Sequence, residues 1–173
     1  YTLMFLSTAL FDKPAFKNVI VSGIVLAKDG KKMSKRLKNY TAPDELMDHY
    51  GADALRLYLI HSGLVKAEEQ RFDDEGVRDM TRRTLLPWMN AYKFFHTYAT
   101  VDKWKETHLE TKQSKNILDQ WIISRLQSLK SRIEEQMNVY QLAHVVPELL
   151  HFLDELTNVY IRLNRHRFWT ESM

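Results

Sequence analysis

The sequence of 173 residues contains no cysteine, which excludes a disulfide-stabilised scaffold and any metal site built on thiolates. Long apolar runs are also missing. The longest stretch without a charged residue spans positions 136–147, whereas a membrane-spanning helix needs about 20 residues. We therefore expect no membrane partner. Apolar residues nevertheless make up 45% of the chain and aromatic residues 12%, which is enough to build a core and excludes a disordered protein.

Glycine and proline are scarce in the second half of the chain. All five glycines lie within residues 1–76, and beyond them the sequence contains only two prolines, Pro87 and Pro147. Sequence that is poor in both residues and rich in Leu, Lys, Glu and Arg favours long helices. We therefore expect a mainly α fold. A boundary near residue 74 would separate a small α/β segment, residues 1–74, from a helical bundle, residues 75–173.

The first of these segments combines short elements of both kinds. Residues 1–11 have the pattern of the end of a helix, and the β-branched run at 19–26 predicts a buried strand. Residues 41–44, Thr-Ala-Pro-Asp, predict a helix start with the Thr41 hydroxyl as its cap. A second short helix is expected over 52–60.

Three long helices are predicted in the second segment. The first covers about 75–98 and should be kinked or split at Pro87, because an interior proline removes a backbone hydrogen bond. After a polar connection at 102–115, the other two cover about 115–137 and 142–165, the last with Pro147 as a kink or as its true start. Each of these two carries an apolar stripe that needs a partner, which indicates a bundle. The stripes comprise Leu118, Ile122, Leu126, Leu129, Ile133 and Met137, and Leu142, Val146, Leu149, Leu153, Leu156, Tyr160 and Leu163.

Positive charge is concentrated in one short segment. The whole sequence has a net charge of +3, but residues 28–38 hold six Lys or Arg side chains against Asp29 alone, so they carry +5 and the remainder −2. Asp29-Gly30 is a turn signal directly after the predicted strand. A basic cluster by itself is typical of a solvated loop, a localisation signal or a nonspecific nucleic-acid patch. A P-loop is excluded, because position 25 is Val instead of Gly and position 32 is Lys instead of Ser or Thr.

The order of motifs favours a specific interpretation of this segment. Residues 32–36, Lys-Met-Ser-Lys-Arg, resemble the KMSKS signature of class I aminoacyl-tRNA synthetases, which follows the last strand of the nucleotide-binding core. Residues 51–56, Gly-Ala-Asp-Ala-Leu-Arg, resemble a helix found shortly after it in that family. Further resemblance, to the isoleucine-specific branch in its eukaryotic cytosolic form, extends over essentially the whole chain through residues 67–79, 86–92, 119–126 and 156–167.

The resemblance implies ATP as a substrate, with Mg²⁺ expected to accompany it, and a loop that stabilises the charge on the reacting phosphates. Lys35 is then the principal phosphate-stabilising residue and Lys32 its partner, since a lysine ammonium is a compact, mobile charge. Met33, Ser34 and Arg36 complete the expected ATP-binding loop. We expect Ser34 to contribute a hydroxyl donor and Met33 to pack against the core.

The resemblance also implies that the helical bundle is of the anticodon-binding type and contacts tRNA(Ile). The candidate tRNA contacts are Arg125, Arg162, Arg165 and Arg167. Helix capping is the alternative for the three arginines at the end of the last helix, and ordinary surface charge for Arg125.

The aromatic and imidazole side chains of the bundle have weaker implications. Trp88, Trp104, Trp121 and Trp169 could stack on bases, but core packing is favoured for Trp88 and Trp121. His144 and His151 lie seven residues apart, too far to chelate one ion, and we expect no metal site.

The chain begins at Tyr1 inside an apolar stretch and has no His-Ile-Gly-His-type ATP motif, which predicts a fragment. We expect it to depend on isoleucine, ATP and the rest of a cytoplasmic synthetase chain, and to be inactive alone. Valine, leucine or methionine synthetases are the alternatives within the family. A noncatalytic nucleic-acid-binding module, in which all the loop's positive residues are interchangeable, and a protein-assembly bundle remain as alternatives outside it.

Overall fold

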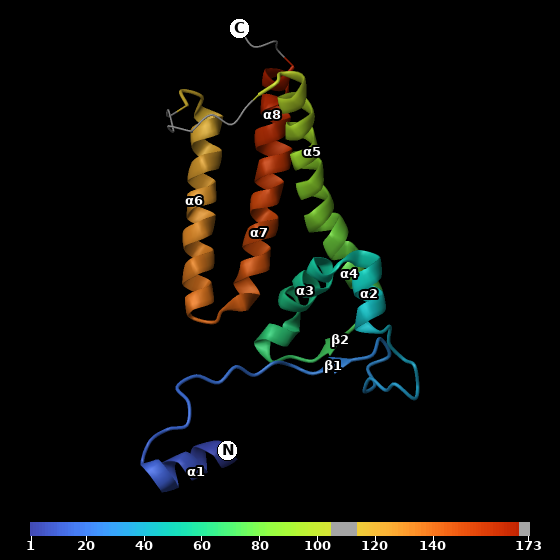
Figure 1. Cartoon of the computed structure of the whole chain (residues 1–173), viewed down its shortest axis with the longest axis vertical. Helices are drawn as coiled ribbons and strands as arrows, with labels where there is room; N and C mark the ends of the chain where they lie inside the picture. The colour runs from blue at the N-terminus through green and yellow to red at the C-terminus, as the bar shows by residue number, and fades with distance from the viewer. Residues whose placement is uncertain (105–113, 170–173) are drawn as a thin grey trace.

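The computed structural model describes residues 1–104 and 114–169, and it confirms a mainly α fold (Figure 1). Three long helical segments lie side by side: α5 (Leu86–Val101), α6 (Ile117–Asn138) and a segment that begins with α7 (Val145–Asp154). The helices α2 (Pro43–Tyr50) and α3 (Ala52–His61) lie at one end of them. Most of the predicted connection at 102–115 lies outside the described residues.

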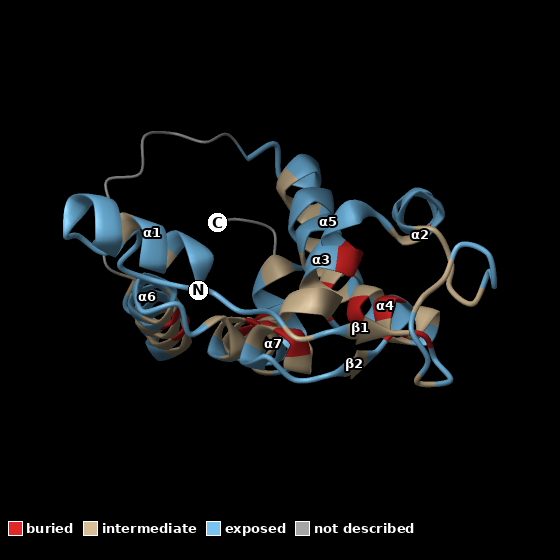
Figure 2. Ribbon diagram, turned by 90° about the horizontal axis from the view of Figure 1, so that it is seen from below, coloured by how far each residue is buried: buried red, intermediate tan, exposed pale blue. Residues whose placement is uncertain are grey.

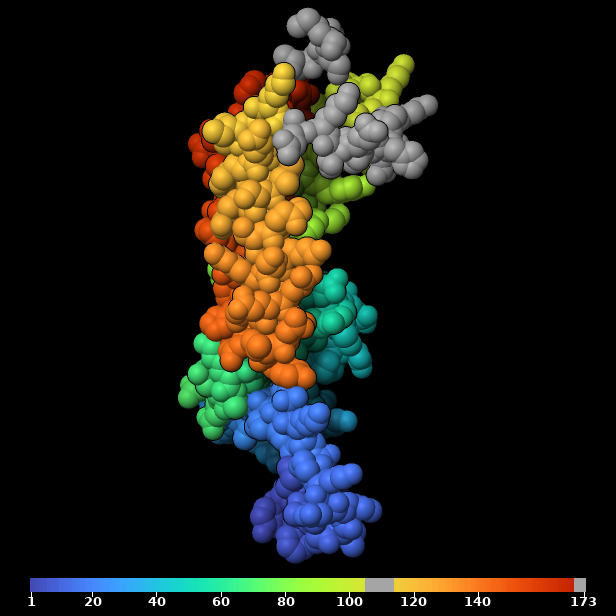
Figure 3. All heavy atoms as spheres, turned by 90° about the vertical axis from the view of Figure 1, so that its left-hand side faces the viewer, coloured from blue at the N-terminus to red at the C-terminus, as the bar shows by residue number. Residues whose placement is uncertain are grey.

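The first helix, α1 (Thr2–Phe11), lies apart from the other helices (Figures 1 and 3). It buries none of its residues (Figure 2). Its existence confirms the helix expected over 1–11. Of the predicted strand at 19–26, only β1 (Val25–Leu26) forms, paired in parallel with β2 (Gln70–Arg71). The buried strand was therefore wrong for most of its length. The reason is that no further strand lies beside it among the described residues, so Val19, Ile20 and Val21 stay more than 60% exposed.

A first core joins α2 and α3 to α4 (Asp74–Met80). Leu46, Ala54, Leu55, Phe72 and Val77 are buried together. The short helices form as predicted, but α2 begins differently from the prediction: its N-cap is Ala42, without a side-chain cap, and Pro43 takes the first helical position. Thr41 does not cap the helix because its hydroxyl is bonded to Asp74 instead.

Pro87 has the effect expected of it. Between α4 and α5 the chain passes through a π-helical segment, Thr81–Leu85, which ends two residues before the proline. The proline ring would clash with a carbonyl four residues earlier in a regular α-helix, and the wider π turn accommodates this. The helix predicted over 75–98 is thus one continuous helical path, interrupted next to Pro87.

A second core lies between α6 and α7. It buries Ile122, Leu129 and Phe152, with Trp121 and Leu149 among the half-buried side chains packed around them. These contacts confirm that the two apolar stripes face each other. Leu126 and Met137 were wrongly placed in the stripe of α6, because each is almost half exposed.

The last helical segment changes type along its length. A 3₁₀ turn at Leu142–His144 precedes α7, so Pro147 lies in the first turn of the α-helix, and a π-helical segment, Glu155–Ile161, follows it. Next come α8 (Arg162–Asn164) and a 3₁₀ turn, Arg165–Phe168. A π turn holds more residues than an α turn and shifts the buried stripe by one position. Leu163, predicted to be buried, is therefore exposed, and Asn164 is buried in its place.

None of the described helices has both the length and the apolar character required to span a membrane.

Candidate functional site

The basic segment forms a loop, residues 28–39, which we call the lysine loop. It begins with a tight turn after β1, in which the Gly30 amide donates to Ala27 O and the Ala27 amide donates to Lys31 O, both at 2.8 Å. Gly30 has a φ of +78°, a left-handed conformation that a side chain disfavours, and this confirms the predicted turn. Lys32 then forms an isolated antiparallel bridge with Leu26. The start of the loop is therefore fixed to the end of the strand.

The middle of the loop is held by the packing of one side chain and by two hydrogen bonds from another. Met33 is half-buried and packs against the first core, as predicted. The Ser34 amide donates to Asn39 Oδ1 at 2.9 Å, and Asn39 Nδ2 donates to Lys32 O at 3.2 Å. A turn over 35–38 connects these residues. Sequence reasoning overlooked Asn39, because a single asparagine after a basic run carries no signal of its own.

The predicted catalytic side chains are exposed on this loop. Lys32, Lys35 and Arg36 all face solvent. In the part of the chain that the structure describes, none of the three has a hydrogen-bonded or ion-paired partner for its charged group. The structure thus places both lysines on one short loop with a fixed backbone and unengaged ammonium groups. Lys31 differs, because its ammonium lies 3.6 Å from the Asp29 carboxylate.

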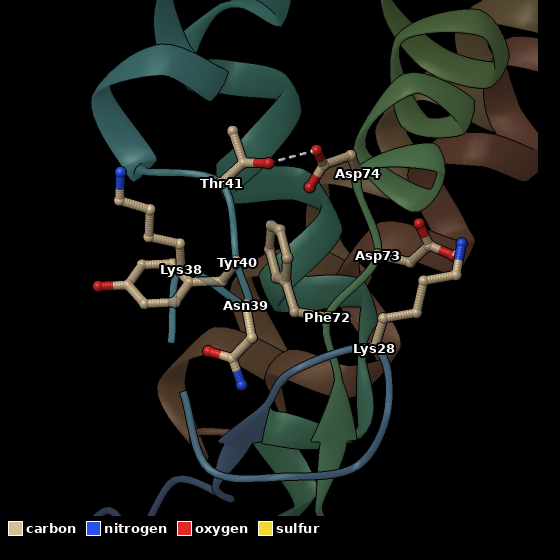
Figure 4. A pocket seen from close by; sticks show the side chains of 8 residues that line it. All are labelled: Lys28, Lys38, Asn39, Tyr40, Thr41, Phe72, Asp73 and Asp74. Carbon is tan, nitrogen blue, oxygen red and sulfur yellow. Dashed lines mark hydrogen bonds and ion pairs between the residues drawn. The ribbon is translucent and has the colours of Figure 1, made fainter. Parts of the chain in front are cut away.

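A cavity of about 470 Å³ lies beside the lysine loop (Figure 4). Its wall comprises Lys28, Lys38, Asn39, Tyr40, Thr41, Phe72, Asp73 and Asp74. It therefore lies between the two ends of the loop and the N-terminus of α4. Both charge signs line it, which suits a polar ligand better than an apolar one.

Both ends of the lysine loop are attached to the start of α4. Lys28 Nζ lies 2.8 Å from Asp73 Oδ2, and the Thr41 hydroxyl donates to Asp74 Oδ2 at 2.6 Å. The hydrogen bond and the opposite charge raise the pKa of Lys28, and the same hydrogen bond lowers the pKa of Asp73. Asp73 also caps α4 by accepting from the Glu75 amide. The sequence signal for Asp73 is its capping position; nothing in the sequence indicates its pairing with Lys28.

The candidate tRNA-contact arginines fall into two groups. Arg125 donates to Glu155 at 2.9 Å, and Arg167 donates to both carboxylate oxygens of Asp119, at 2.6 and 2.9 Å. Both guanidinium groups are therefore engaged within the bundle. Arg162 is exposed, and no residue in the described ranges pairs with it.

Arg165 has aromatic neighbours. Its guanidinium carbon lies 5.9 Å from the ring centre of Phe94 and 5.4 Å from that of Trp169, within the range of cation–π attraction. Trp169 Nε1 also donates to the Tyr98 hydroxyl at 2.6 Å. This group joins α5 to residues 165–169.

The Asp119 carboxylate accepts hydrogen bonds from three side chains of the bundle, Ser114, Tyr160 and Arg167. The bond from Arg167 is the largest cause that lowers its pKa far below the ordinary value, and the Ser114 and Tyr160 hydroxyls add to it. Burial, and to a lesser extent the bond to Asp119, raises the pKa of Tyr160. Asp119 therefore fastens the start of α6 to Tyr160 and Arg167 in the last helical segment.

Two of the four tryptophans were assigned to the core, with opposite outcomes. Trp121 packs against the second core, as predicted. Trp88 is 56% exposed, so its assignment was wrong. It lines an apolar hollow between α5 and Leu156, Tyr160 and Ile161, which the described residues leave open. Trp104 and Trp169 are also exposed.

No group of three His, Asp or Glu side chains in residues 1–104 or 114–169 is arranged to hold a metal ion. His151 instead lies 3.4 Å from Glu155.

Comparison with known proteins identifies similar sequences for both halves of the chain. Residues 1–71 match the family model of class I tRNA synthetases (I, L, M and V), and residues 119–173 match that of the anticodon-binding domain of tRNA ligases. Together the two matches include the lysine loop and the second core.

Individual relatives are similar over almost the whole chain. Isoleucine–tRNA ligase of Bdellovibrio bacteriovorus is 52% identical over 100% of this chain and 16% of its own length. The cytoplasmic isoleucine–tRNA ligase of Arabidopsis thaliana is 56% identical over 96% of this chain and 14% of its own length. The chain thus spans less than a fifth of each relative. Bacterial and eukaryotic relatives are similar to nearly the same degree.

A solved structure shares the fold. It is the ternary complex of an Agrobacterium radiobacter LeuRS with tRNA and LeuAMS, with a TM-score of 0.66. Sequence identity is 18%, and the match covers 96% of this chain and 21% of that chain.

Proposed function

The chain belongs to the class I tRNA synthetases of the isoleucine, leucine, methionine and valine group, and on this premise we propose that it is part of an isoleucine–tRNA ligase. In such an enzyme the isoleucine carboxylate attacks the α-phosphorus of ATP. The bond to the bridging oxygen breaks, and isoleucyl-adenylate and pyrophosphate form. The isoleucyl group then passes to a terminal ribose hydroxyl of tRNA(Ile), and AMP leaves.

The observation that carries this proposal is the unengaged pair of ammonium groups on the lysine loop. Negative charge grows on the pentacoordinate phosphorus and on the departing pyrophosphate, and donors that meet this charge stabilise the transition state more than the ground state. Lys35 is the principal donor and Lys32 its partner. Their backbone is held in place, while the long lysine side chains stay mobile enough to close on the phosphates.

The remaining residues of the motif have supporting roles in this proposal. Ser34 offers its hydroxyl to the nucleotide, Met33 anchors the loop on the core, and Arg36 adds positive charge. Mg²⁺ is proposed only as an ion that arrives with ATP, because the loop presents nitrogen cations where Mg²⁺ requires oxygen ligands. We assign no step to the ion.

The two segments of the chain divide the work. Residues 1–74 supply the phosphate loop, and residues 75–173 supply the helices that contact tRNA, with α4 packed on the first core as the joint. Arg162 and Arg165 are the preferred tRNA contacts, because Arg125 and Arg167 already bind carboxylates within the bundle. The names of the relatives support isoleucine as the amino acid and a cytoplasmic location.

The test is ATP–pyrophosphate exchange by the full-length protein that contains this chain. Lys35→Ala should lower the exchange rate by about 10²–10³, the scale of losing one well-placed donor. The matched control is Lys31→Ala, which removes a neighbouring ammonium that already faces Asp29, and it should leave the rate within about twofold.

Equal losses in both variants would favour the nonspecific, purely electrostatic module. A near-wild-type rate for Lys35→Ala would overturn the role of the loop. Exchange should depend on isoleucine; stimulation by valine, leucine or methionine in its place would assign the chain to another member of the family. The isolated chain of 173 residues should show no exchange.

A further inference from the structure

The lysine loop is closed by one side chain. The carboxamide of Asn39 accepts from the Ser34 amide and donates to the Lys32 carbonyl, at 2.9 and 3.2 Å. An asparagine side chain has one acceptor and one pair of donors, so both of its ends are used here on a single stretch of backbone. The loop that leaves at Lys32 is thereby fastened to its own end, seven residues later.

The geometry of this contact resembles strand pairing. The two backbone groups bonded by Asn39 flank Met33: one is the carbonyl before it and the other is the amide after it. In a parallel β-ladder a residue bonds its neighbour in the same way, to the residues on either side of its partner. The Asn39 side chain therefore makes the two bonds around Met33 that a residue of a neighbouring parallel strand would make.

We call these two hydrogen bonds of the Asn39 side chain the clamp, and they lie next to both charged lysines. Lys32 lies at one of its two bonds, and Lys35 directly follows the other bond at Ser34. Both lysine side chains stay exposed and unpaired within the described part of the chain. The clamp thus restrains the backbone that carries the two ammonium groups without engaging either group.

The rest of the loop makes the clamp necessary. Arg36, Leu37 and Lys38 are exposed, so packing does not hold the turn over 35–38. Lys38 has a φ of +47°, a left-handed conformation that costs a non-glycine residue about 1–2 kcal/mol. A turn with little packing and an unfavourable residue needs hydrogen bonds from elsewhere to stay closed.

We propose that Asn39 is a positioning residue for the phosphate chemistry, because its carboxamide fixes the backbone from which Lys32 and Lys35 reach the nucleotide. This inference rests on the proposed function of the loop and deepens it. Asn39 touches no reacting atom in this scheme. It acts through the two lysines, so its loss should matter only while they are present.

The experiment measures ATP–pyrophosphate exchange in the full-length protein with Asn39→Ala, Lys35→Ala and the double variant. Misplacing a catalytic group by about 1 Å costs on the order of 10²-fold. We expect Asn39→Ala to lower kcat by about 10–100-fold while the KM for the amino acid changes by less than about twofold. In the Lys35→Ala background the same substitution should lower kcat by less than about threefold, since residues that act as a unit are not additive.

Two further variants separate positioning from stability. Asn116→Ala makes the same substitution at another asparagine that bonds backbone, the N-cap of α6, which accepts from the Leu118 amide at 2.8 Å. It should lower Tm but leave kcat unchanged. Asn39→Asp keeps the acceptor for Ser34 but turns a carboxylate oxygen towards the Lys32 carbonyl, and it should lose kcat as Asn39→Ala does. This variant replaces Asn39→Ala if that protein fails to fold.

The outcomes are distinguishable from those of the function itself. A normal kcat in Asn39→Ala and Asn39→Asp, with a large loss in Lys35→Ala, would overturn the clamp and leave the function in place. Full additivity in the double variant, or a loss in Asn39→Ala that follows Tm as in Asn116→Ala, would reduce Asn39 to a structural residue. A normal rate in Lys35→Ala would overturn the proposed function of the loop as well.

Discussion

The Thr41 hydroxyl donates to the Asp74 carboxylate at 2.6 Å, a bond between residues 33 positions apart. It joins the chain just after the lysine loop to the first residue of α4. The Lys28–Asp73 ion pair makes a similar connection at the first residue of the loop. Both ends of the loop are therefore attached to one helix end. That helix continues through the π-helical segment into α5.

We predict that Thr41→Val, which keeps the shape and removes the hydroxyl, loosens the end of the loop. A hydrogen bond to a charged group contributes about 1.5–3 kcal/mol, and part of it is recovered by water at this half-exposed site. Amide exchange of residues 32–41 in the full-length protein should therefore become about 5–10-fold faster. The measurement is hydrogen exchange followed by mass spectrometry.

Thr97→Val is the matched control for this change, because the Thr97 hydroxyl bonds only to Lys93 O within its own helix. It should leave exchange in the loop unaltered. Unchanged exchange in Thr41→Val would show that the long-range bond does not restrain the loop.

We predict that replacing Gly76 with alanine destabilises the fold, although this substitution usually stabilises a helix. Replacing a helical glycine with alanine normally stabilises a helix by about 0.5–1 kcal/mol. In α4, however, a β-carbon on Gly76 would overlap the Tyr58 ring, with Tyr58 Cζ at 2.9 Å. Gly76→Ala should therefore lower the free energy of unfolding by about 1–3 kcal/mol, as overpacking does, measured by thermal unfolding. Adding Tyr58→Leu should recover part of the loss; a stabilised single variant would contradict the packing of α3 on α4.

Asp119 gives a prediction about pH. Its pKa in the folded chain lies far below its ordinary value of 3.8, chiefly because Arg167 donates to it. A carboxylate with a depressed folded pKa contributes stability that is complete above the ordinary pKa and is lost as pH falls towards the folded value. Asp119→Asn should lower the free energy of unfolding by about 2–3 kcal/mol at pH 7, the scale of charged hydrogen bonds.

The difference in Tm between wild type and Asp119→Asn should narrow as the pH is lowered from 4 to 2, measured by circular dichroism. Asp154→Asn is the control, since its exposed carboxylate bonds only a neighbouring amide side chain on its own helix. A constant difference between wild type and Asp119→Asn across this pH range would show that Asp119 contributes by shape instead of charge.

The arginines give a prediction about tRNA. Arg162→Ala should weaken tRNA binding by the full-length protein and reduce the slope of log affinity against log salt by about 1, the effect of one lost phosphate contact. Arg125→Ala should leave this slope unchanged and lower Tm, because it removes the guanidinium that Glu155 binds. The reverse pattern would move the tRNA contact from the end of the chain to α6.

The sequence predicted the elements whose information is local. Apolar periodicity located α6 and α7, and Pro87 marked the interruption between α4 and α5. The basic segment and the packing of Met33 could also be predicted, because a charge cluster and an apolar residue within it are visible in one dimension. These features depend on neighbours a few positions away, and their physical causes act over that range.

The tertiary structure decided the features that depend on distant partners. Whether residues 19–26 form a strand depends on a second strand being alongside, and within residues 1–104 and 114–169 only Gln70 and Arg71 provide one. The π turns shifted the buried stripe from Leu163 to Asn164, since the phase of a helix depends on every turn before it. The clamp by Asn39 and the bond from Thr41 to Asp74 are likewise three-dimensional: hydrogen bonds need atoms within about 3 Å, and sequence separation does not measure that distance.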